Sequence, residues 1–373
     1  MILGRKNNKG VASVFNHPIV IGINLGSTSS EIGVRTGDGV ITKQKLMHSD
    51  EILALPVTQQ LSARTEGIRE WLAKGAGISL GGISAIACRG GRLKPIASGV
   101  YAVNEALLED SRSTAEGDHA SRMSVFIGRE LAKETKCPIF VVDPISVDEF
   151  WPVSRISGLK GVSRKSLGHA LNSKYIARKL AEDIGRDYDK SRFIIAHMGG
   201  GATISLHING QMVDLINDFE GAFTPERSGM LPMTEMLRLC TQNDIQTVTK
   251  WVEGAGGIYS YLGTKRFDVL EEKASQKDNE AQLLLEAYVY QQKKSLGALY
   301  AAAGFALDGL ALTGGIANSG YVVESLSHMF KGKAVVRVYP GSFEIEALIE
   351  GALGALEGKV TVRQYPDGRP LCK

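Results

Sequence analysis

The feature that most constrains the fold of this chain is a run of strands and glycine-rich turns that occurs twice, about 170 residues apart. In the first run, predicted strands lie over 19–24, 31–35 and 39–47, with the polar turn 26–30 after the first of them. In the second run, they lie over 193–197, 202–208 and 211–216, with three glycines at 199–201. Asn209-Gly210 is a strong signal for a two-residue hairpin. The repeated order predicts an α/β protein of two like domains, each a mixed sheet with helices on its faces.

The rest of the chain supports this reading. Predicted helices lie over 58–73, 119–136, 172–183, 281–303 and 345–356, and further strands over 83–88, 138–142, 309–313 and 334–339. Gly351 and Gly354 fall inside the last helix and predict close packing against a neighbouring element. A length of 373 residues also suits two domains.

Composition excludes several classes of protein. The net charge is only +3, and basic and acidic residues are interspersed, so no surface for nucleic acid is expected. No stretch reaches the ~18 apolar residues of a membrane helix, and no signal-peptide pattern is found. The cysteines form no CxxC pair, which predicts reduced thiols: Cys88, Cys137, Cys240 and Cys372. We therefore expect a cytoplasmic protein without membrane or nucleic-acid partners.

The glycine turns suit phosphate binding. A tight turn of glycine and serine exposes backbone N–H groups on one side, and phosphate oxygens fit such a hollow. A single turn of this kind is more often a simple hairpin corner, but two at matching places predict a grip on a polyphosphate. Neither the GxxxxGK[ST] motif nor a clean GxGxxG motif occurs, which disfavours P-loop and dinucleotide folds. A third glycine site, 312–317, is either a slot for adenosine or a plain corner between strand and helix.

A series of short motifs extends this pattern along the chain. They are 23–30 (INLGSTSS), 89–96 (RGGRLKPI), 142–144 (VDP), 148–149 (DE), 154–159 (SRISGL), 164–166 (RKS), 169–172 (HALN), 196–201 (AHMGGG), 225–229 (PERSG), 261–264 (YLGT), 312–317 (LTGGIA), 339–341 (YPG) and 346–348 (EAL). In this order they resemble the acetokinase family and, within it, most closely the butyrate kinases. The family belongs to the superfamily of actin-like, sugar-kinase and chaperone ATPase folds.

The resemblance implies a fold and an activity. The fold would be two duplicated ribonuclease H-like domains with a cleft between them, comprising residues 1–147 plus 345–373 and residues 148–344. The activity would be reversible phosphoryl transfer from ATP to the carboxylate of a short-chain fatty acid, with butanoate as the expected acid and Mg²⁺ as the cofactor. The resemblance also implies a homodimer or a larger homo-oligomer.

A carboxylate acceptor sets an unusual electrostatic problem. Its pKa is near ~4, so it is ionised at neutral pH and needs no general base. The difficulty is to bring this anion to the anionic γ-phosphate, which requires cations and fixed hydrogen-bond donors. The family's arginines and histidines meet this need.

The resemblance assigns catalytic roles to a set of charged and polar residues: Arg89, Asp143, His169, Arg227 and His119. Arg89 would bind the carboxylate or the phosphoryl group, although acetate kinases place this arginine a few residues earlier. Arg227 matches the second active-site arginine. His169 matches the histidine that would stabilise the transition state, and His119 matches another histidine at the active site. Asp143, at the end of a predicted strand, would hold Mg²⁺ or position an arginine. Outside these motifs, surface ion pairs or structural histidines would be the ordinary interpretation.

The resemblance also gives a set of nucleotide-binding residues: Asn24, Gly26, Ser27, Thr28, Ser29, His197, Gly199, Gly200, Gly201, Gly314, Gly315 and Ile316. His197 is expected to order the second turn. The metal would be held by Asp143, Glu346 and Asn24, with Glu344 as an alternative to Glu346. Both glutamates also stand at a predicted helix start, where acidic residues stabilise a helix in any protein.

Two departures from the family pattern bear on the substrate. Arg122 replaces a small amide near the presumed acyl pocket, and the extension before Pro18 has no family counterpart. Kinases for acetate, propionate or branched-chain acids therefore stay open as alternatives. So do a non-catalytic nucleotide-binding switch and a sugar or polyol kinase, which would need a carboxylate base.

Overall fold

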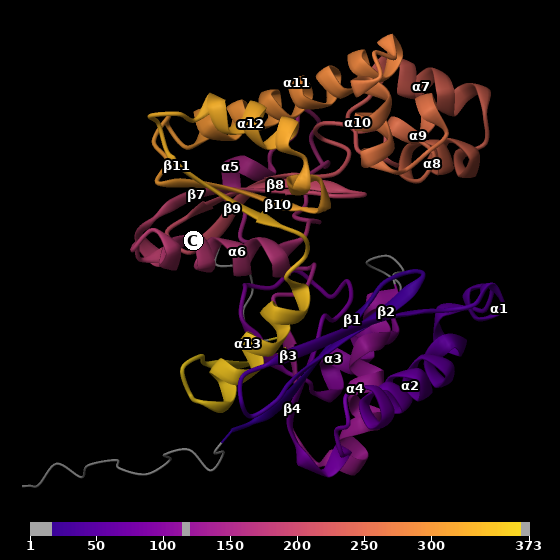
Figure 1. Ribbon diagram of the computed structural model, residues 1–373, viewed down its shortest axis with the longest axis vertical. Coiled ribbons are helices and arrows are strands. Elements are labelled where there is room, and N and C mark those ends of the chain that lie inside the picture. The colour runs from indigo at the N-terminus through magenta and orange to yellow at the C-terminus, as the bar shows by residue number, and fades with distance from the viewer. Residues whose placement is uncertain (1–16, 114–119, 367–373) are drawn as a thin grey trace, which may run out of the picture. The chain divides into compact units, whose positions relative to one another are not determined.

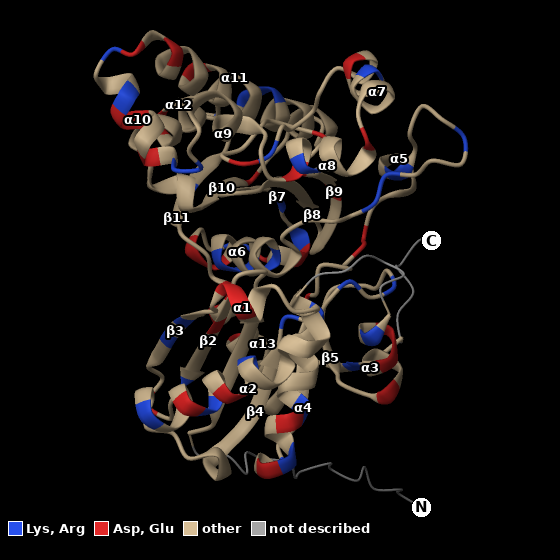
Figure 2. Cartoon of the chain, turned by 90° about the vertical axis from the view of Figure 1, so that its right-hand side faces the viewer, with Lys and Arg blue, Asp and Glu red and all other residues tan. Residues whose placement is uncertain are grey.

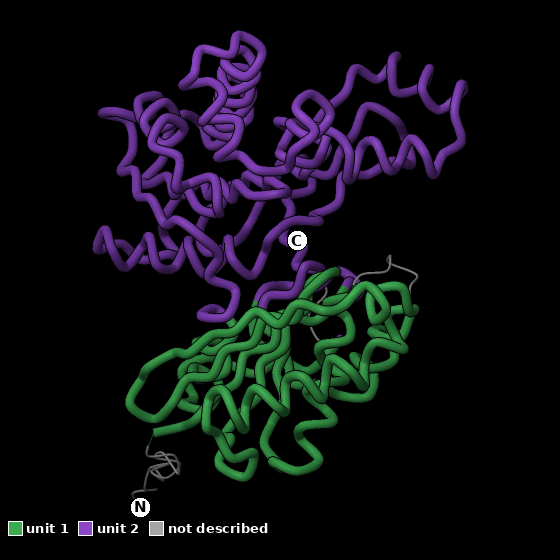
Figure 3. The backbone as a smooth tube through the Cα atoms, turned by 45° about the vertical axis from the view of Figure 1, so that its right-hand side comes forward, with its two compact units in different colours: residues 1–91, 99–142, 348–365 green, residues 92–98, 143–347, 366–373 purple. Residues whose placement is uncertain are grey.

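The computed structural model describes residues 17–113 and 120–366 of the chain. The chain divides into two units, drawn in two colours in Figure 3. The first takes in Met1–Gly91, Gly99–Val142 and Leu348–Tyr365, and the second takes in Arg92–Ser98, Asp143–Ala347 and Pro366–Lys373. Each unit thus combines segments that lie far apart in the sequence.

Within the described residues, a mixed sheet of seven strands forms the centre of the first unit. The strands are β1 (Ile19–Leu25), β2 (Ser29–Arg35), β3 (Ile41–Met47), β4 (Ile83–Cys88), β5 (Val100–Ala102), β6 (Ile139–Val142) and β12 (Val362–Gln364). Their spatial order is β12-β5-β6-β4-β1-β2-β3. The strand β1 is inside the sheet, antiparallel to β2 and parallel to β4. Its continuous apolar run suits a strand that is covered on both faces.

Helices pack on this sheet, as Figure 1 shows. They are α2 (Leu61–Glu70), α3 (Glu105–Arg112) and α4 (Ser124–Thr135), and the later segment α13 (Glu344–Leu356) returns to the unit. A short helix, α1 (Asp50–Leu53), buries none of its residues. The predicted close approach of the last helix is confirmed at Gly351, where a Cβ atom would lie 2.6 Å from Cγ1 of Val142. The absent side chain lets α13 lie directly against the end of β6.

The second unit contains a mixed sheet of five strands among the described residues. The strands are β7 (Arg192–Met198), β8 (Ala202–Ile208), β9 (Gln211–Ile216), β10 (Gly309–Gly314) and β11 (Val335–Pro340), in the order β11-β10-β7-β8-β9. As β1 does in the first unit, β7 runs antiparallel to the strand after its glycine turn and parallel to a later strand. The predicted duplication of an α/β fold with mixed sheets is therefore confirmed.

The second sheet has one core on each face. On one face, Ile194 and Ala196 of β7 pack in a core with α11 (Asn279–Ala302) and α12 (Gly320–Met329). On the other face, Phe193 and Ile195 pack against α6 (Ala170–Asp183). Alternate side chains of a strand point to opposite faces, which explains this division. In Figure 2 the strands of this sheet carry little charge, whereas α6 and α10 (Phe267–Ser275) are marked by charged residues.

Smaller helices complete the second unit. They are α5 (Pro152–Arg155), α7 (Met233–Gln242), α8 (Ile245–Glu253) and α9 (Gly257–Leu262). No helix in the described part of the chain is both long enough and apolar enough to cross a membrane.

One predicted helix, 58–73, is divided in the structure. A 3₁₀ turn, Val57–Gln60, precedes α2, and a π turn, Trp71–Gly75, follows it. The N–H of Ala76 donates to the carbonyl of Trp71, five residues back, at 2.8 Å, and the indole ring covers Gly75. The bulky ring beside a glycine widens the last turn of the helix.

Candidate active site

The first glycine turn follows β1, and Asn24 is the next-to-last residue of that strand. The Asn24 amide is buried: Nδ2 donates to Oε2 of Glu31 at 3.1 Å, and Oδ1 accepts from Nη1 of Arg89 at 3.0 Å. The N–H of Arg89 also donates to the carbonyl of Ile23 at 3.1 Å, because β1 and β4 run side by side. Two residues that the sequence singled out, Asn24 and Arg89, are therefore in direct contact.

Beneath this turn lies an arginine that sequence reasoning missed. Arg64 of α2 is 1% exposed and donates to the carbonyls of Gly26, Ser27 and Ser29 at 3.1–3.2 Å. A single arginine in a predicted amphipathic helix gives no signal that it bonds a turn more than thirty residues away.

The second glycine turn follows β7 and lies beside Arg227. Thr224 Oγ1 donates to the carbonyl of Gly200 at 2.5 Å and accepts from the N–H of Arg227 at 3.1 Å. A Cβ atom on Gly201 would lie 3.3 Å from Cζ of Arg227. The turn and the arginine, 26 positions apart in sequence number, are thus neighbours in this unit, as a shared phosphoryl-binding role requires.

Asp218 holds the Arg227 side chain in this place. Its Oδ2 atom forms an ion pair with Nη1 of Arg227, and its Oδ1 atom accepts from the N–H of Ala202 at 2.7 Å. Burial raises the pKa of Asp218, while the guanidinium of Arg227 opposes this shift. The sequence analysis did not select Asp218, whose position next to Arg227 depends on the folded loop.

The two histidines of the second unit stack on each other. The ring centroids of His169 and His197 are 4.2 Å apart, with 25° between the planes. Nδ1 of His169 lies 3.0 Å from Oγ1 of Thr203. His197 lies beside the second turn, as predicted. A Cβ atom on Gly199 would be 3.8 Å from Nε2 of His197.

The hydrogen bonds of Asn172 fix the tautomer of His197. The N–H of Phe343 donates to Oδ1 of Asn172 at 3.0 Å, so the Nδ2 amide group of Asn172 faces the ring. This group donates to Nδ1 of His197 at 3.0 Å. A neutral ring that accepts at Nδ1 carries its proton on Nε2. His197 therefore presents a donor on the side of the glycine turn.

The three predicted metal-binding carboxylates, Asp143, Glu344 and Glu346, differ in their burial and surroundings. Asp143 follows β6, is 1% exposed, and its Oδ2 atom accepts from Nη2 of Arg178 at 2.5 Å. Arg178, on α6, is a second arginine that the sequence did not single out. In the first turn of α13, Glu344 is buried and Glu346 is half-buried. Among the described residues, no group of three or more His, Cys, Asp or Glu side chains is gathered around a metal position.

The third glycine site lies against the second turn. Gly314 has φ +91°, and a Cβ atom there would lie 2.2 Å from the carbonyl oxygen of Met198, so only glycine fits. A Cβ atom on Gly315 would meet nothing within 4 Å. The side chain of Ile316 packs in the core, so only its backbone remains for a ligand.

A cavity of about 480 Å³ adjoins Arg227. Val162, Leu167 and Phe219 give it apolar walls, while Arg92 and Arg227 bring guanidinium groups. The Nε atoms of these two arginines are buried and have no hydrogen-bond partner within the described residues. A space with both apolar walls and unsatisfied cationic donors suits a small molecule with an anionic group and a short alkyl chain.

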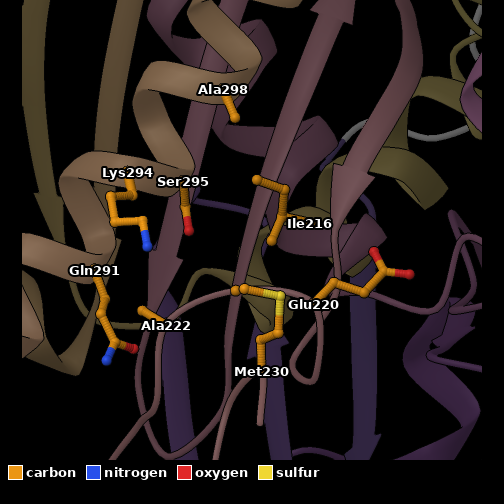
Figure 4. Close-up of a pocket in the computed structure, with 9 residues that line it drawn as sticks. Ile216, Glu220, Ala222, Met230, Gln291, Lys294, Ser295 and Ala298 are labelled. Carbon is orange, nitrogen blue, oxygen red and sulfur yellow. The ribbon is translucent and has the colours of Figure 1, made fainter. Parts of the chain in front are cut away.

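A second cavity, of about 270 Å³, is drawn in Figure 4. Lys294 and Ser295 project into it from α11, opposite Ile216, and Glu220 lines both cavities. Glu220 also forms an ion pair with Arg164 at 2.9 Å. The second cavity contains none of the predicted catalytic residues.

Two further sequence observations concern the first unit. Arg122 is 5% exposed, and its Nη1 atom donates to the carbonyls of Ser111 and Arg112 at 3.2 and 3.3 Å. Its guanidinium therefore caps the end of α3. His119 lies outside the described residues.

Comparisons with known proteins agree with these features. The sequence model described as the Acetokinase family matches residues 157–334. A protein named butyrate kinase 1, from Clostridium acetobutylicum, is 39% identical over 92% of this chain and 98% of its own length. One named probable butyrate kinase, from Enterococcus faecalis, is 39% identical over 94% of this chain and 98% of its own length.

Solved structures show the same fold. The crystal structure of Porphyromonas gingivalis acetate kinase has a TM-score of 0.75 and 20% identity, covering 91% of this chain and 99% of that one. That of a propionate kinase from Francisella tularensis has a TM-score of 0.74 and 16% identity, covering 90% and 98%. The resemblance to the acetokinase family is confirmed, and the chain has the fold of these kinases.

Proposed function

Because the chain belongs to the acetokinase family, we propose that it transfers the γ-phosphoryl group of ATP reversibly to butanoate, giving butanoyl phosphate and ADP. The near end-to-end match to two proteins named as butyrate kinases supports this acid. The structural observation that carries the proposal is Arg227, which lies beside the second glycine turn and also lines the 480 Å³ cavity.

The reaction is a direct displacement at phosphorus. A carboxylate oxygen of butanoate forms the new P–O bond while the bond to the β–γ bridging oxygen breaks, and that electron pair leaves with ADP. The carboxylate is already ionised at neutral pH, so no base has to remove a proton. Catalysis then consists of positioning the two anions and offsetting their charge.

The second unit offers donors suited to the transferring group. Arg227 supplies a guanidinium, and its ion pair with Asp218 restricts its position. His197 carries a proton on Nε2 towards the glycine turn, and His169 stacks on it. We assign these donors to the oxygens of the phosphoryl group, where fixed hydrogen bonds stabilise developing charge.

We assign the acid to the 480 Å³ cavity. Butanoate has a three-carbon tail, which would lie along Val162, Leu167 and Phe219, with its carboxylate near Arg92 and Arg227. Each methylene group buried there contributes ~0.8 kcal/mol, so wall size would set the preferred chain length.

Mg²⁺ is the proposed cofactor, and Asp143 and Glu346 are the carboxylates that would hold it. An ion held by phosphates, waters and one or two carboxylates needs no cluster of protein ligands, and two acidic side chains fit that need. When bound, Mg²⁺ would offset the charge of the ATP phosphates. An ion pair with Arg178 holds the Asp143 carboxylate in place.

A substrate panel tests the proposal. Acids from two to six carbons, straight and branched, are supplied with ATP, and acyl phosphate is trapped as the hydroxamate. We expect kcat/KM to be highest for butanoate, because the apolar walls reward each added carbon until the cavity is full. An optimum at acetate would contradict the butanoate assignment, and phosphorylation of sugars alone would point to a different class of kinase.

Arg227→Ala separates an enzyme from a nucleotide-binding switch. We expect kcat to fall by ~10³ or more, as for arginines aimed at a transferring phosphoryl group, with ADP affinity nearly unchanged. The matched control is Arg238→Ala, which removes an exposed arginine of α7 and should leave kcat unchanged. Equal loss of turnover and ADP affinity would contradict the assigned role.

A further inference from the structure

Arg64 is a buried cation wrapped by neutral groups. Its Nη1 atom donates to the carbonyl oxygens of Gly26 and Ser29 and to Oγ of Ser30, and its Nη2 atom donates to the carbonyl of Ser27. Nε and Nη2 also donate to Oε1 of Gln60, which is itself 4% exposed. A guanidinium with five fixed donors is well suited to bind several carbonyls of one turn.

These bonds fix the direction of the peptide groups in the first glycine turn. In a trans peptide, the N–H of one residue points opposite to the carbonyl of the residue before it. Arg64 holds the carbonyls of Gly26 and Ser27 toward α2, so the N–H groups of Ser27 and Thr28 point away from it. Ser27 and Thr28 are exposed, and in the described part of the chain neither N–H donates to another residue.

The charge of Arg64 is the second observation. No carboxylate among the described residues pairs with it, and its hydrogen bonds go to three carbonyls, a hydroxyl and an amide. A buried cation without a counter-ion costs free energy, and burial lowers the pKa of this guanidinium. Such an arrangement is suited to an anion that arrives from outside, on the far side of the turn.

We propose that Arg64 is a positioning residue for nucleotide binding: it fixes the N–H groups of Ser27 and Thr28 outward and supplies the buried positive charge that faces an ATP phosphate across the turn. This inference rests on the proposed function only in taking the ligand to be a nucleotide. The acid plays no part in it.

The two effects are separated by two substitutions. Arg64→Lys keeps a cation but not the fork that binds three carbonyls, so the turn loses its fixed direction. Gln60→Glu keeps an acceptor of the same shape for Arg64 and adds a carboxylate that neutralises it. Gln60→Glu gives the buried cation a partner but loses the hydrogen bond from Nε2 of Gln60 to the carbonyl of Leu55 at 2.7 Å, so the urea midpoint has to show that this variant folds.

The measurement is the affinity of the full chain for ADP by calorimetry, with the urea midpoint of each variant. We expect both variants to weaken ADP about tenfold or more, since each loses charge-assisted hydrogen bonds or a buried opposing charge. The KM for ATP should rise by a similar factor, and the KM for butanoate should stay within about twofold. Arg69→Lys, in the same helix but in an ion pair with Glu134 that is partly exposed, is the matched control and should change neither.

A purely structural role gives a different result. If Gln60→Glu binds ADP within about twofold of the natural chain, the charge part of the proposal is overturned. If a folded Arg64→Lys does so as well, the positioning part is overturned too. If the natural chain phosphorylated none of the acids while both variants still lost ADP affinity, that result would contradict the proposed substrate and support the role of Arg64.

Discussion

At the scale of single residues, the second unit contains a buried ion pair. Nζ of Lys174, on α6, lies 2.7 Å from Oε2 of Glu149 and donates to the carbonyl of Gly210 at 2.7 Å. Oε1 of Glu149 accepts from the N–H and the hydroxyl of Ser98 at 3.0 and 2.6 Å, and Oε2 accepts from the N–H of Met212 at 2.8 Å. Burial alone would raise the pKa of Glu149, but Lys174 and these donors lower it to about 2.

This pair predicts an acid-sensitive stability. A carboxyl whose pKa is lowered on folding stabilises the protein above its unfolded pKa of about 4.5, and that contribution is lost as pH falls toward about 2. Glu149→Gln should remove this part of the pH dependence and cost about 3–5 kcal/mol at pH 7, because it leaves the buried Lys174 ammonium without its counter-charge. Urea unfolding at pH 7 and pH 3 measures both effects.

The control for this prediction is Glu130→Gln, which removes a partly exposed partner of Lys133. Its effect should stay below ~1 kcal/mol, as for other surface pairs. If Glu149→Gln were equally mild, the pair would not hold Ser98 and α6 in place as inferred.

The same scale shows what sequence alone could not predict. Arg64 and Arg178 bind groups about 35 positions away in the chain, and those contacts depend on how helices dock on strands. The stacking of His169, just before α6, on His197 of β7 is likewise a tertiary contact. The motifs singled out the glycine turn, Asp143 and the two histidines. Arg64 and Arg178, which bind the turn and Asp143, had no signal in the local sequence.

At the scale of elements, turn chemistry was the most informative part of the sequence. Asn209 and Gly210 have φ of +51° and +78°, as the predicted two-residue hairpin requires. The glycines of 199–201 come directly after a buried strand, so the second turn was predictable as well. The π turn at Trp71 was not, because it depends on the ring closing over Gly75.

Gly351 allows a test of how closely α13 packs on its neighbours. Gly351→Ala should lower the free energy of unfolding by about 1–3 kcal/mol, because its Cβ atom would lie 2.6 Å from Cγ1 of Val142. Gly67→Ala, in α2 of the same unit, meets only Leu46 Cδ1 at 3.8 Å. It should raise that free energy by about 0.5–1 kcal/mol through helix propensity. Urea titration of the two variants measures the difference, and equal shifts would contradict close packing at Gly351.

At the scale of the whole molecule, the first unit is completed by the end of the chain. A chain that ends at Ala347 keeps 143–347 of the second unit but lacks β12 and most of α13. We expect its first unit to unfold, because β5 loses its parallel neighbour and β6 loses its cover. The second unit should keep a cooperative urea transition.

Tryptophan fluorescence distinguishes the two units in this experiment. Trp71 lies in the first unit, whereas Trp151 and Trp251 lie in the second. In the shortened chain, a variant that retains only Trp71 should give the spectrum of an unfolded protein, and one that retains the other two should unfold as in the full chain. A native Trp71 spectrum would show that the first unit folds without its last segment.

The divided first unit also sets an order of events on the ribosome. Its strands β1 to β6 are synthesised first, whereas α13 and β12 leave the exit tunnel after 143–347 of the second unit has been synthesised. The main segment of the second unit, 143–347, is made before most of α13 and before β12. Domains generally fold as units during synthesis, so the later-made half of this protein reaches its native state first. The nascent chain must meanwhile keep an unfinished sheet from aggregating.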